Sequence, residues 1–233
     1  MDNALKLQLL EYLRQFITED RWETINKVLD RRTRYLTVVL EDIYQPHNAS
    51  AVLRSCDGFG IQDVHTIENH NDFDPNKSVT IGADKWLTHL SYSASGRNNT
   101  KECYQSLRQK GYRLIATSPH YDDVSIDEVP LDQPTALVFG SELTGLTDYA
   151  LEEADAYARI PMEGFSESFN ISVGAALCLY ELSRKLRNSQ VAWRLSEEEK
   201  LELRLDWVRK SVREPEMLEE RFLNELQEKG EQE

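Results

Sequence analysis

Short runs of β-branched and apolar residues alternate with helix-like segments between residues 35 and 187, and this alternation constrains the fold more than any other feature of the sequence. Strands are predicted at 35–41, 63–68, 112–118, 135–140 and 156–160, and helices at 48–59, 97–110, 145–153 and 168–187. Strands that alternate with helices form a parallel sheet whose two faces are both covered by helices. The sequence therefore predicts an α/β domain over residues 35–188.

The flanks of this domain have a different pattern, with leucines and aromatic residues at helical spacing. Residues 3–31 predict a helical hairpin in which Thr18 caps the second helix. Beyond residue 188, Ser196 and Glu199 have the spacing of a capping box, and Pro215 marks a break before a last helix. We therefore expect helical extensions at 1–34 and 189–233.

Composition argues against several classes of protein. The chain has 233 residues and 40% hydrophobic content, which is enough for a packed core. No apolar run reaches the roughly 18 residues of a membrane span, so we expect a cytoplasmic protein with no membrane partner. The cysteines, Cys56, Cys103 and Cys178, are odd in number and widely spaced. This pattern argues against a zinc site and a disulfide scaffold, and we expect no metal.

The net charge of -14 argues against a nucleic-acid partner, because phosphate contacts need Lys and Arg. The distribution of the charge changes that interpretation. Residues 37–183 contain 9 basic and 22 acidic residues, whereas the other 86 residues contain 18 basic and 19 acidic residues. Two basic clusters lie in these flanks, at 31–34 and 184–187. They fit either solvated helix faces or a surface that binds nucleic acid.

Three loops that follow predicted strands carry unusual residues, and ligands bind at this edge of an open parallel sheet. In the first, "EDIYQPHNASAVLRSCDGFG", Pro46 ends the strand and Asn48 is placed to open a helix, either as its N-cap or as a site residue. Arg54 follows on the same helix among residues that look packed. Because a guanidinium in a packed position needs an anion or another acceptor, Arg54 is a candidate ligand-binding residue.

The other two loops contribute glycines and a polar helix start. In "LVFGSELTGL", Gly140 ends a buried strand, permits close approach of the backbone to a ligand, and is followed by Glu142 and Gly145. The glycine spacing matches neither a dinucleotide fingerprint nor a P-loop. In "ARIPMEGFSESFNIS", Ser168 and Asn170 belong to a helix start with more polar groups than capping uses. Backbone amides there are suited to bind a carboxylate or phosphate.

Together the three loops resemble the motifs of the SpoU or TrmH family of the SPOUT superfamily, whose members are RNA 2'-O-ribose methyltransferases. The first motif corresponds to Asn48, Ala51, Arg54 and Phe59-Gly60, the second to "LVFGSELTGL" and the third to "IPMEGFSESFNISVGAALCLYE". The resemblance covers residues 42–181, with Phe169 in place of the usual leucine. It implies a deep trefoil knot, an exception among folds, and a homodimer that completes each active site.

The resemblance also implies S-adenosylmethionine as the cofactor and a set of site residues. The implied catalytic residues are Arg54, Asn48, Glu142, Ser168 and Asn170. The residues implied to bind the cofactor are Thr117, Gly140, Ile160, Met162 and Phe169. Arg54 is either the base or a group that binds the 2'-oxygen and a phosphate. A guanidinium has a pKa above about 12, so we favour the second role, with phosphate or water accepting the proton.

The substrate follows from finer features of the resemblance. The segments "QPHN" and "GADKW" and the helical extensions resemble the members that methylate guanosine 18 in the D-loop of tRNA. Ribosomal RNA is the alternative substrate, and a catalytically silent RNA-binding factor is the rival from another class, although retention of the implied catalytic residues argues against it. The residues predicted to bind RNA are Arg31, Arg32, Arg34, Lys85, Arg184, Lys185 and Arg187.

Overall fold

The computed structural model describes residues 1–118 and 124–230, and the chain divides into two compact units. One unit is Thr33–Trp193, and the other combines Met1–Arg32 with Arg194–Glu233. The two predicted helical extensions therefore fold together as one unit, although they lie at opposite ends of the sequence.

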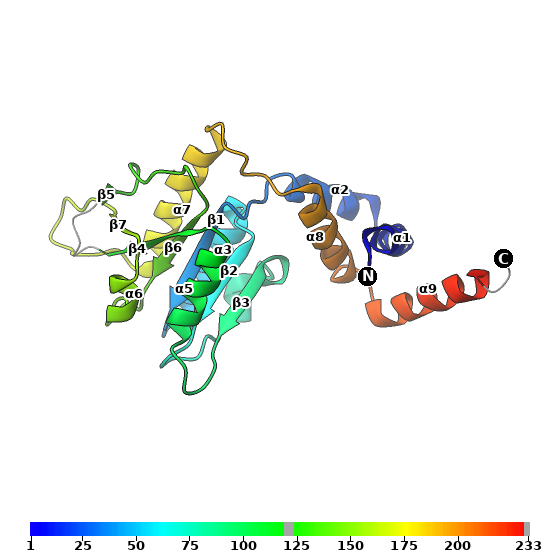
Figure 1. Cartoon of the computed structure of the whole chain (residues 1–233), viewed down its shortest axis with the longest axis horizontal. Coiled ribbons are helices and arrows are strands. Elements are labelled where there is room, and N and C mark those ends of the chain that lie inside the picture. The colour runs from blue at the N-terminus through cyan, green and yellow to red at the C-terminus, as the bar shows by residue number, and fades with distance from the viewer. Residues whose placement is uncertain (119–123, 231–233) are drawn as a thin grey trace. The chain divides into compact units, whose positions relative to one another are not determined.

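The unit Thr33–Trp193 contains a seven-stranded sheet (Figure 1). The strands are β1 (Leu36–Glu41), β2 (Asp63–Ile67), β3 (Thr88–Tyr92), β4 (Arg113–Thr117), β5 (Val124–Ser125), β6 (Thr135–Phe139) and β7 (Ala156–Arg159). They lie in the order β3-β2-β1-β6-β4-β7-β5, and the pairs along this order are parallel. The predicted parallel α/β class is confirmed. The trefoil knot stays a prediction, because strand order does not define how the connecting loops thread.

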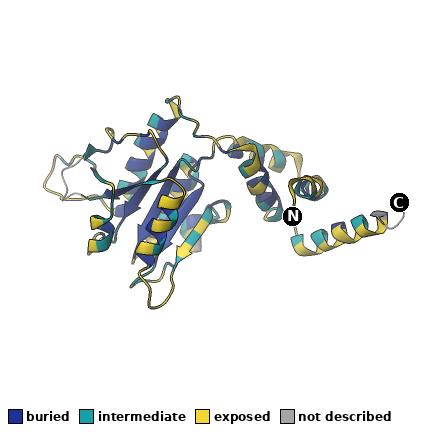
Figure 2. Cartoon of the chain, in the orientation of Figure 1, coloured by how far each residue is buried: buried dark blue, intermediate teal, exposed yellow. Residues whose placement is uncertain are grey.

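Helices cover both faces of this sheet. They are α3 (Pro46–Phe59), α4 (Lys77–Thr80), the 3-10 helix η1 (Asp84–Trp86), α5 (Asn99–Gln109), α6 (Asp148–Glu152) and α7 (Ile171–Arg187). Alternate residues of a strand point to opposite faces. On β1, Val38 and Leu40 pack in a cluster with residues of α3 and α7, whereas Val39 packs in a second cluster with residues of α5 and α6. The central strands β1 and β6 are accordingly buried between two helical layers (Figure 2).

The sequence and the structure differ at several elements of this unit, among them the short helices α4 and η1, which the sequence analysis did not predict. The sequence analysis missed β3, an edge strand with alternating partial burial, and the two-residue strand β5. Helix α3 begins at Pro46, with Gln45 as its N-cap, rather than at Asn48. Proline suits the first helical position because the N–H that it lacks would have no partner there. Asn48 is therefore not a helix cap, and its side chain is available for other contacts.

The second unit is helical, with α1 (Asn3–Arg14), α2 (Glu19–Leu29), α8 (Glu197–Arg209) and α9 (Pro215–Gly230). The predicted caps are confirmed: Thr18 accepts a hydrogen bond from the Arg21 amide at 3.3 Å, and Ser196 and Glu199 form a reciprocal capping box. Leucines of α1 and α8 are buried in this unit. No helix in the described ranges is both long and apolar enough to span a membrane.

Arg32 belongs to the interior of this helical unit. Its side chain is 1% exposed, and its guanidinium carbon lies 5.3 Å from the centroid of the Trp207 ring. A cation over an indole face gains from the ring quadrupole, which helps to offset burial of the charge. The prediction that Arg32 contacts RNA is therefore corrected: it is a packing residue of the helical unit.

Candidate active site

A cavity of about 890 Å³ lies where β4, β6 and β7 end. These strands are neighbours in the sheet and run parallel, so the loops that follow them emerge at the same edge. The cavity lining includes Thr117 at the end of β4, the segment 139–146 that follows β6, and Ile160 beyond β7. The N-terminal turn of α7 supplies a further part of the wall. The site is thus built from loops held by the parallel core of the sheet.

Nine residues that the sequence analysis assigned to catalysis or cofactor binding line this one cavity. They are Asn48, Thr117, Gly140, Glu142, Ile160, Met162, Ser168, Phe169 and Asn170. They come from separate parts of the sequence, so only the fold brings them together. Their chemical roles remain predictions, but their predicted proximity is a property of the structure.

Three of these residues form a chain of polar contacts at the cavity. Asn48 donates from its amide nitrogen to the carboxylate of Glu142 and to Oε1 of Gln45, the latter at 3.1 Å. Asn170 donates from Nδ2 to Oδ1 of Asn48 at 3.2 Å. The first turn of α3, the loop after β6 and the start of α7 are therefore joined through the Asn48 amide, which uses both its donor and its acceptor.

The polar helix start at Asn170 has two functions in the fold. Asn170 is the N-cap of α7, and its Oδ1 accepts hydrogen bonds from the amide and the hydroxyl of Ser172 at 2.9 and 2.6 Å. An N-cap needs only the side-chain oxygen. The amide nitrogen of Asn170 is left to reach Asn48, which a serine cap would not do. Ser168 lies on the exposed approach to this turn and lines the cavity.

The β6–α6 loop, residues 140–147, turns tightly and explains both of its glycines. Ser141 and Gly145 exchange backbone hydrogen bonds of 3.1 and 3.0 Å, and Gly145 has a φ of 71°, which favours glycine. A Cβ atom at Gly140 would lie 2.2 Å from the carbonyl carbon of Gly145. The close approach that Gly140 permits is therefore to the chain itself. The expected close approach of a ligand to Gly140, which also lines the cavity, stays a prediction.

Arg54 is the predicted catalytic residue that the structure leaves outside the cavity lining. Its side chain is exposed, and Nη1 donates to the carbonyl of Val79 at 3.4 Å. Val52 and Leu53 are buried beside it, but Arg54 points away from that packed face. The expectation that Arg54 lies in a packed position is wrong. Its guanidinium is accessible to an anion at the surface of α3.

The other predicted RNA-binding cations have mixed environments. Arg34 forms an ion pair with Asp63 at 3.1 Å, Lys185 donates to the carbonyls of Asp127 and Val129, and Arg187 donates to the carbonyl of Phe59 at 2.7 Å. These contacts give Arg34, Lys185 and Arg187 structural roles. The side chains of Arg31, Lys85, Arg184 and Arg187 are exposed, and Arg184 forms an ion pair with Glu181 at 2.9 Å.

Sequence reasoning missed several residues of the cavity wall. Gln45, Leu146 and Cys178 line the cavity, and the sequence analysis gave none of them a site role. The sequence feature that could have identified Gln45 is its position directly before Pro46, where α3 begins. Cys178 is a packing residue, as expected of the cysteines: burial raises the pKa of its thiol to about 12, so it stays neutral and poorly nucleophilic at neutral pH.

The lining of the cavity suits a nucleoside that carries a polar tail. Phe139, Leu146 and Ile171 supply apolar surface, while Thr117 and Glu142 supply polar groups. A volume of about 890 Å³ lies within the range of small-molecule sites in proteins. In the described ranges, no group of three or more His, Cys, Asp or Glu side chains is placed to hold a metal ion. The arrangement fits S-adenosylmethionine, the cofactor that the motifs imply.

A parallel α/β sheet with a cavity at its carboxyl edge, walled in part by the Asn170–Asn48–Glu142 contacts, is the architecture of the class of α/β proteins that bind a nucleoside-sized ligand. Within this class, the chain belongs to the SpoU rRNA Methylase family, whose model matches residues 35–180. The match spans the cavity and its three loops.

Individual relatives extend the similarity into the helical unit. A Borreliella burgdorferi protein named tRNA (guanosine(18)-2'-O)-methyltransferase is 39% identical over 213 residues, covering 91% of this chain and 95% of the relative. A Thermus thermophilus protein of the same name is 34% identical over 195 residues, covering 83% and 98%. The solved A. aeolicus TrmH/SpoU tRNA modifying enzyme has a TM-score of 0.74 at 28% identity, covering 84% and 98%.

A second solved structure bears on the cofactor. It is the SpoU methyltransferase AviRb from Streptomyces viridochromogenes, in complex with the cofactor AdoMet. Its TM-score to this chain is 0.57 at 25% identity, and the alignment covers 70% of this chain and 62% of that one.

Proposed function

We propose that this protein transfers a methyl group from S-adenosylmethionine to the ribose 2'-oxygen of guanosine 18 in tRNA. The observation that carries the proposal is the convergence of the nine predicted site residues on one cavity. Relatives that share 30–39% identity and carry the name tRNA (guanosine(18)-2'-O)-methyltransferase support the choice of substrate. A cytoplasmic location is inferred from that substrate.

The cavity-lining residues divide the binding of the cofactor between them. When bound, S-adenosylmethionine supplies an electrophilic methyl group on a positively charged sulfur. The backbone groups of Thr117, Gly140, Ile160, Met162 and Phe169, which line the cavity, would hold the cofactor. Asn48 fixes the carboxylate of Glu142, so that the loop after β6 keeps one arrangement during binding. Such a fixed site favours alignment of the methyl group with an incoming oxygen.

Arg54 acts on the RNA side of the reaction. Its guanidinium stays protonated at neutral pH and offers several donors to an oxyanion or a phosphate. It therefore binds the 2'-oxygen and a neighbouring phosphate and stabilises negative charge there, while phosphate or water accepts the proton. Arg54 lies outside the lining of the cavity in its own chain, which fits an arrangement in which a second subunit supplies the guanidinium at each site.

A homodimer provides this arrangement, and the exposed face of α7 supports it. Val173, Leu177 and Tyr180 lie at spacings of four and three residues and are 46%, 41% and 55% exposed. These side chains are thus not simply intramolecular core, as the alternative interpretation would require. A neighbouring apolar face on a second copy would cover them. Light scattering at micromolar concentration should give twice the monomer mass, and a monomeric mass in a sample that methylates RNA would contradict the homodimer.

Incubation with methyl-labelled S-adenosylmethionine tests the whole proposal. Transcripts of tRNA should become labelled, and a transcript with 2'-deoxyguanosine at position 18 should not. Labelling of a ribosomal RNA pool instead would favour the alternative substrate. Binding of RNA without any transfer would favour a silent RNA-binding factor.

Replacement of Arg54 by Ala should abolish transfer and leave the affinity for S-adenosylmethionine nearly unchanged, because Arg54 is outside the cavity lining. Arg54→Lys should also fail, since an ammonium lacks the planar fork of donors. Single-turnover methylation and calorimetry measure the two effects. Arg97→Ala, at another exposed arginine, is the matched control. Near-normal transfer by Arg54→Ala would remove Arg54 from the mechanism.

A further inference from the structure

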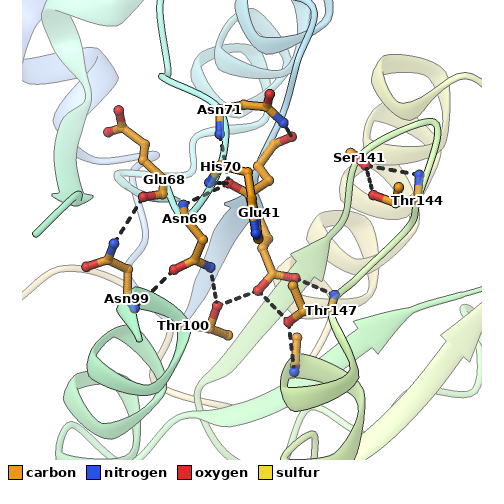
Figure 3. Close-up of polar contacts among 12 residues, drawn as sticks. Glu41, Glu68, Asn69, His70, Asn71, Asn99, Thr100, Ser141, Thr144 and Thr147 are labelled. Carbon is orange, nitrogen blue, oxygen red and sulfur yellow. Dashed lines mark hydrogen bonds and ion pairs between the residues drawn. The ribbon is translucent and has the colours of Figure 1, made fainter. Parts of the chain in front are cut away.

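Glu41 is a buried carboxyl group that the site described above does not use. It ends β1 and is 0% exposed. The carboxylate accepts hydrogen bonds from the Thr147 amide at 2.8 Å, from the Thr147 hydroxyl at 2.9 Å and from the Thr100 hydroxyl at 2.5 Å (Figure 3). Glu41 thus joins the end of the central strand to α5 and to the cap of α6.

Thr147 connects Glu41 to the cavity. It is the last residue of the β6–α6 loop and the N-cap of α6, whose Ala150 amide donates to its hydroxyl at 3.2 Å. Residues 140–146 of the same loop all line the cavity. At its other end the loop is closed by the Ser141–Gly145 pair, and Glu142 between them contacts Asn48. Glu41 therefore holds the point at which the loop returns to the fold.

A second layer of hydrogen bonds fixes Thr100 against Glu41. The Thr100 hydroxyl accepts a hydrogen bond from the side-chain Nδ2 of Asn69 at 2.9 Å. The backbone amide of Asn99 donates to Oδ1 of Asn69 at 3.1 Å. Asn99 in turn donates from Nδ2 to the carbonyl of Glu68 at 3.0 Å (Figure 3). The Thr100 hydroxyl thus accepts from Asn69 on one of its two lone pairs and donates its hydrogen to Glu41. The β6–α6 loop is tied in this way to the ends of β1 and β2.

A carboxyl group is an expensive choice for this position. Its three partners are neutral donors, and a buried carboxyl without a cationic partner costs free energy that an apolar side chain would not. What it provides is acceptor capacity for two hydroxyls and a backbone amide at once. An apolar residue would leave the Thr147 amide without this partner, at a cost that falls on the loop.

We propose that Glu41 is a positioning residue for cofactor binding: it fixes the β6–α6 loop so that the loop backbone and Glu142 keep their places in the cavity wall. Glu41 does not itself line the cavity. The inference rests on the proposed function, because it takes S-adenosylmethionine as the ligand of that cavity.

Two substitutions and one control separate positioning from general stability. Glu41→Leu removes all the acceptors. Glu41→Gln keeps an oxygen for the Thr147 amide, and both hydroxyls can rotate to accept from its nitrogen. Thr37→Val is the matched control, because Thr37 lies on the same strand and face, is 0% exposed, and loses one buried hydrogen bond, to the Asp63 carbonyl at 2.7 Å.

Three measurements are made on the full-length protein at a temperature where each variant is folded: hydrogen exchange of amides 141–147, calorimetric affinity for S-adenosylmethionine, and steady-state methylation of tRNA. For Glu41→Leu we expect faster loop exchange and a dissociation constant and KM for S-adenosylmethionine raised about tenfold, as loss of one to two net hydrogen bonds implies. The KM for tRNA should not change. Glu41→Gln should recover most of the affinity for S-adenosylmethionine. Thr37→Val should lower the melting temperature but leave the affinity for S-adenosylmethionine unchanged.

Unchanged cofactor affinity and loop exchange in folded Glu41→Leu would overturn the proposal, and so would an equal loss of affinity in Thr37→Val. If Glu41→Leu does not fold, Thr147→Val decides in its place, with Thr147→Ser as the rescue. The loop exchange is measured without any ligand. Suppose that the wild-type protein binds no S-adenosylmethionine, but that its loop amides still exchange more slowly than those of Glu41→Leu. This result would contradict the proposed function and leave the structural link between Glu41 and the loop intact.

Discussion

At the scale of single residues, the position of Asn170 at a ligand-sized cavity was predictable because its helix start has more polar groups than capping uses, whereas Asn48 could equally have been an N-cap. The environments of the cations were not predictable. Arg32 and Arg34 belong to one basic run in the sequence, yet Arg32 lies over the Trp207 ring and Arg34 pairs with Asp63. Both partners are distant in sequence. A run of basic residues indicates charge, but burial and pairing depend on the tertiary structure.

His65 makes a residue-scale prediction about pH. Burial, with smaller contributions from Lys110 and His89, lowers the pKa of His65 to about 4. The unfolded chain takes up a proton at this side chain near pH 6.5, whereas the folded chain does so only near pH 4. The free energy of unfolding should therefore fall as the pH drops from about 6.5 to about 4, with a total of the order of 3 kcal/mol from this group.

The variant His65→Gln isolates this contribution. It cannot titrate, and its amide can replace the contact of the His65 ring with the Tyr92 hydroxyl, which is 3.2 Å long. Urea unfolding of both proteins at pH 7.5, 6 and 5 gives the comparison. The loss of stability on acidification should be smaller in His65→Gln, and parallel pH profiles would show that His65 is not the cause.

At the scale of elements, the β6–α6 loop should tolerate no side chain at Gly140. A Cβ atom there would lie 2.2 Å from the Gly145 carbonyl carbon and 2.3 Å from the Leu146 nitrogen, and backbone cannot move aside as a flexible side chain can. Gly140→Ala should lower the free energy of unfolding by about 1 to 3 kcal/mol. It should also weaken binding of S-adenosylmethionine, because the displaced backbone lines the cavity.

Gly164→Ala is the control for that substitution. Gly164 lies in the neighbouring loop before α7, and a Cβ atom there would meet nothing within 4 Å. Its melting temperature and cofactor affinity should match those of the wild type. Thermal unfolding and calorimetry on both variants make the comparison, and an unaffected Gly140→Ala would mean that the loop has room to shift.

The strands show how far periodicity reaches at this scale. The five predicted strands lie within about one residue of their observed bounds, and two of them, β1 and β6, have continuous apolar or β-branched runs that are fully buried. β3, "THLSY", has no such run, because an edge strand is covered on fewer sides. Its strand conformation depends on pairing with β2, which is a long-range property.

At the scale of the whole molecule, the order β3-β2-β1-β6-β4-β7-β5 decides where the site is. Local sequence predicts that strands and helices alternate, but not that β4 lies between β6 and β7. That order places the loop after β4 beside the loops after β6 and β7, and so forms the cavity. The resemblance to a family supplied what periodicity could not, namely which loops meet.

The acidic whole molecule should bind tRNA through the few predicted cations that are exposed. Arg31, Lys85 and Arg184 have exposed side chains, although Arg184 also forms an ion pair with Glu181 of its own helix at 2.9 Å. Because the net charge of -14 repels RNA at long range, contact requires local positive surface. A triple Gln variant at these positions should weaken tRNA binding and reduce the log-log salt slope by about 0.7 to 0.9 per lost phosphate contact.

The matched control removes the same charge elsewhere, with Arg97→Gln, Lys101→Gln and Arg221→Gln, all at exposed side chains outside the predicted set. Binding isotherms between about 50 and 200 mM salt measure both slopes. The control should keep the wild-type slope, because a charge that contacts no phosphate releases no counterion. Both triples should keep the affinity for S-adenosylmethionine, since none of these cations lines the cavity. Equal slopes in the two triples would place the RNA surface on other residues.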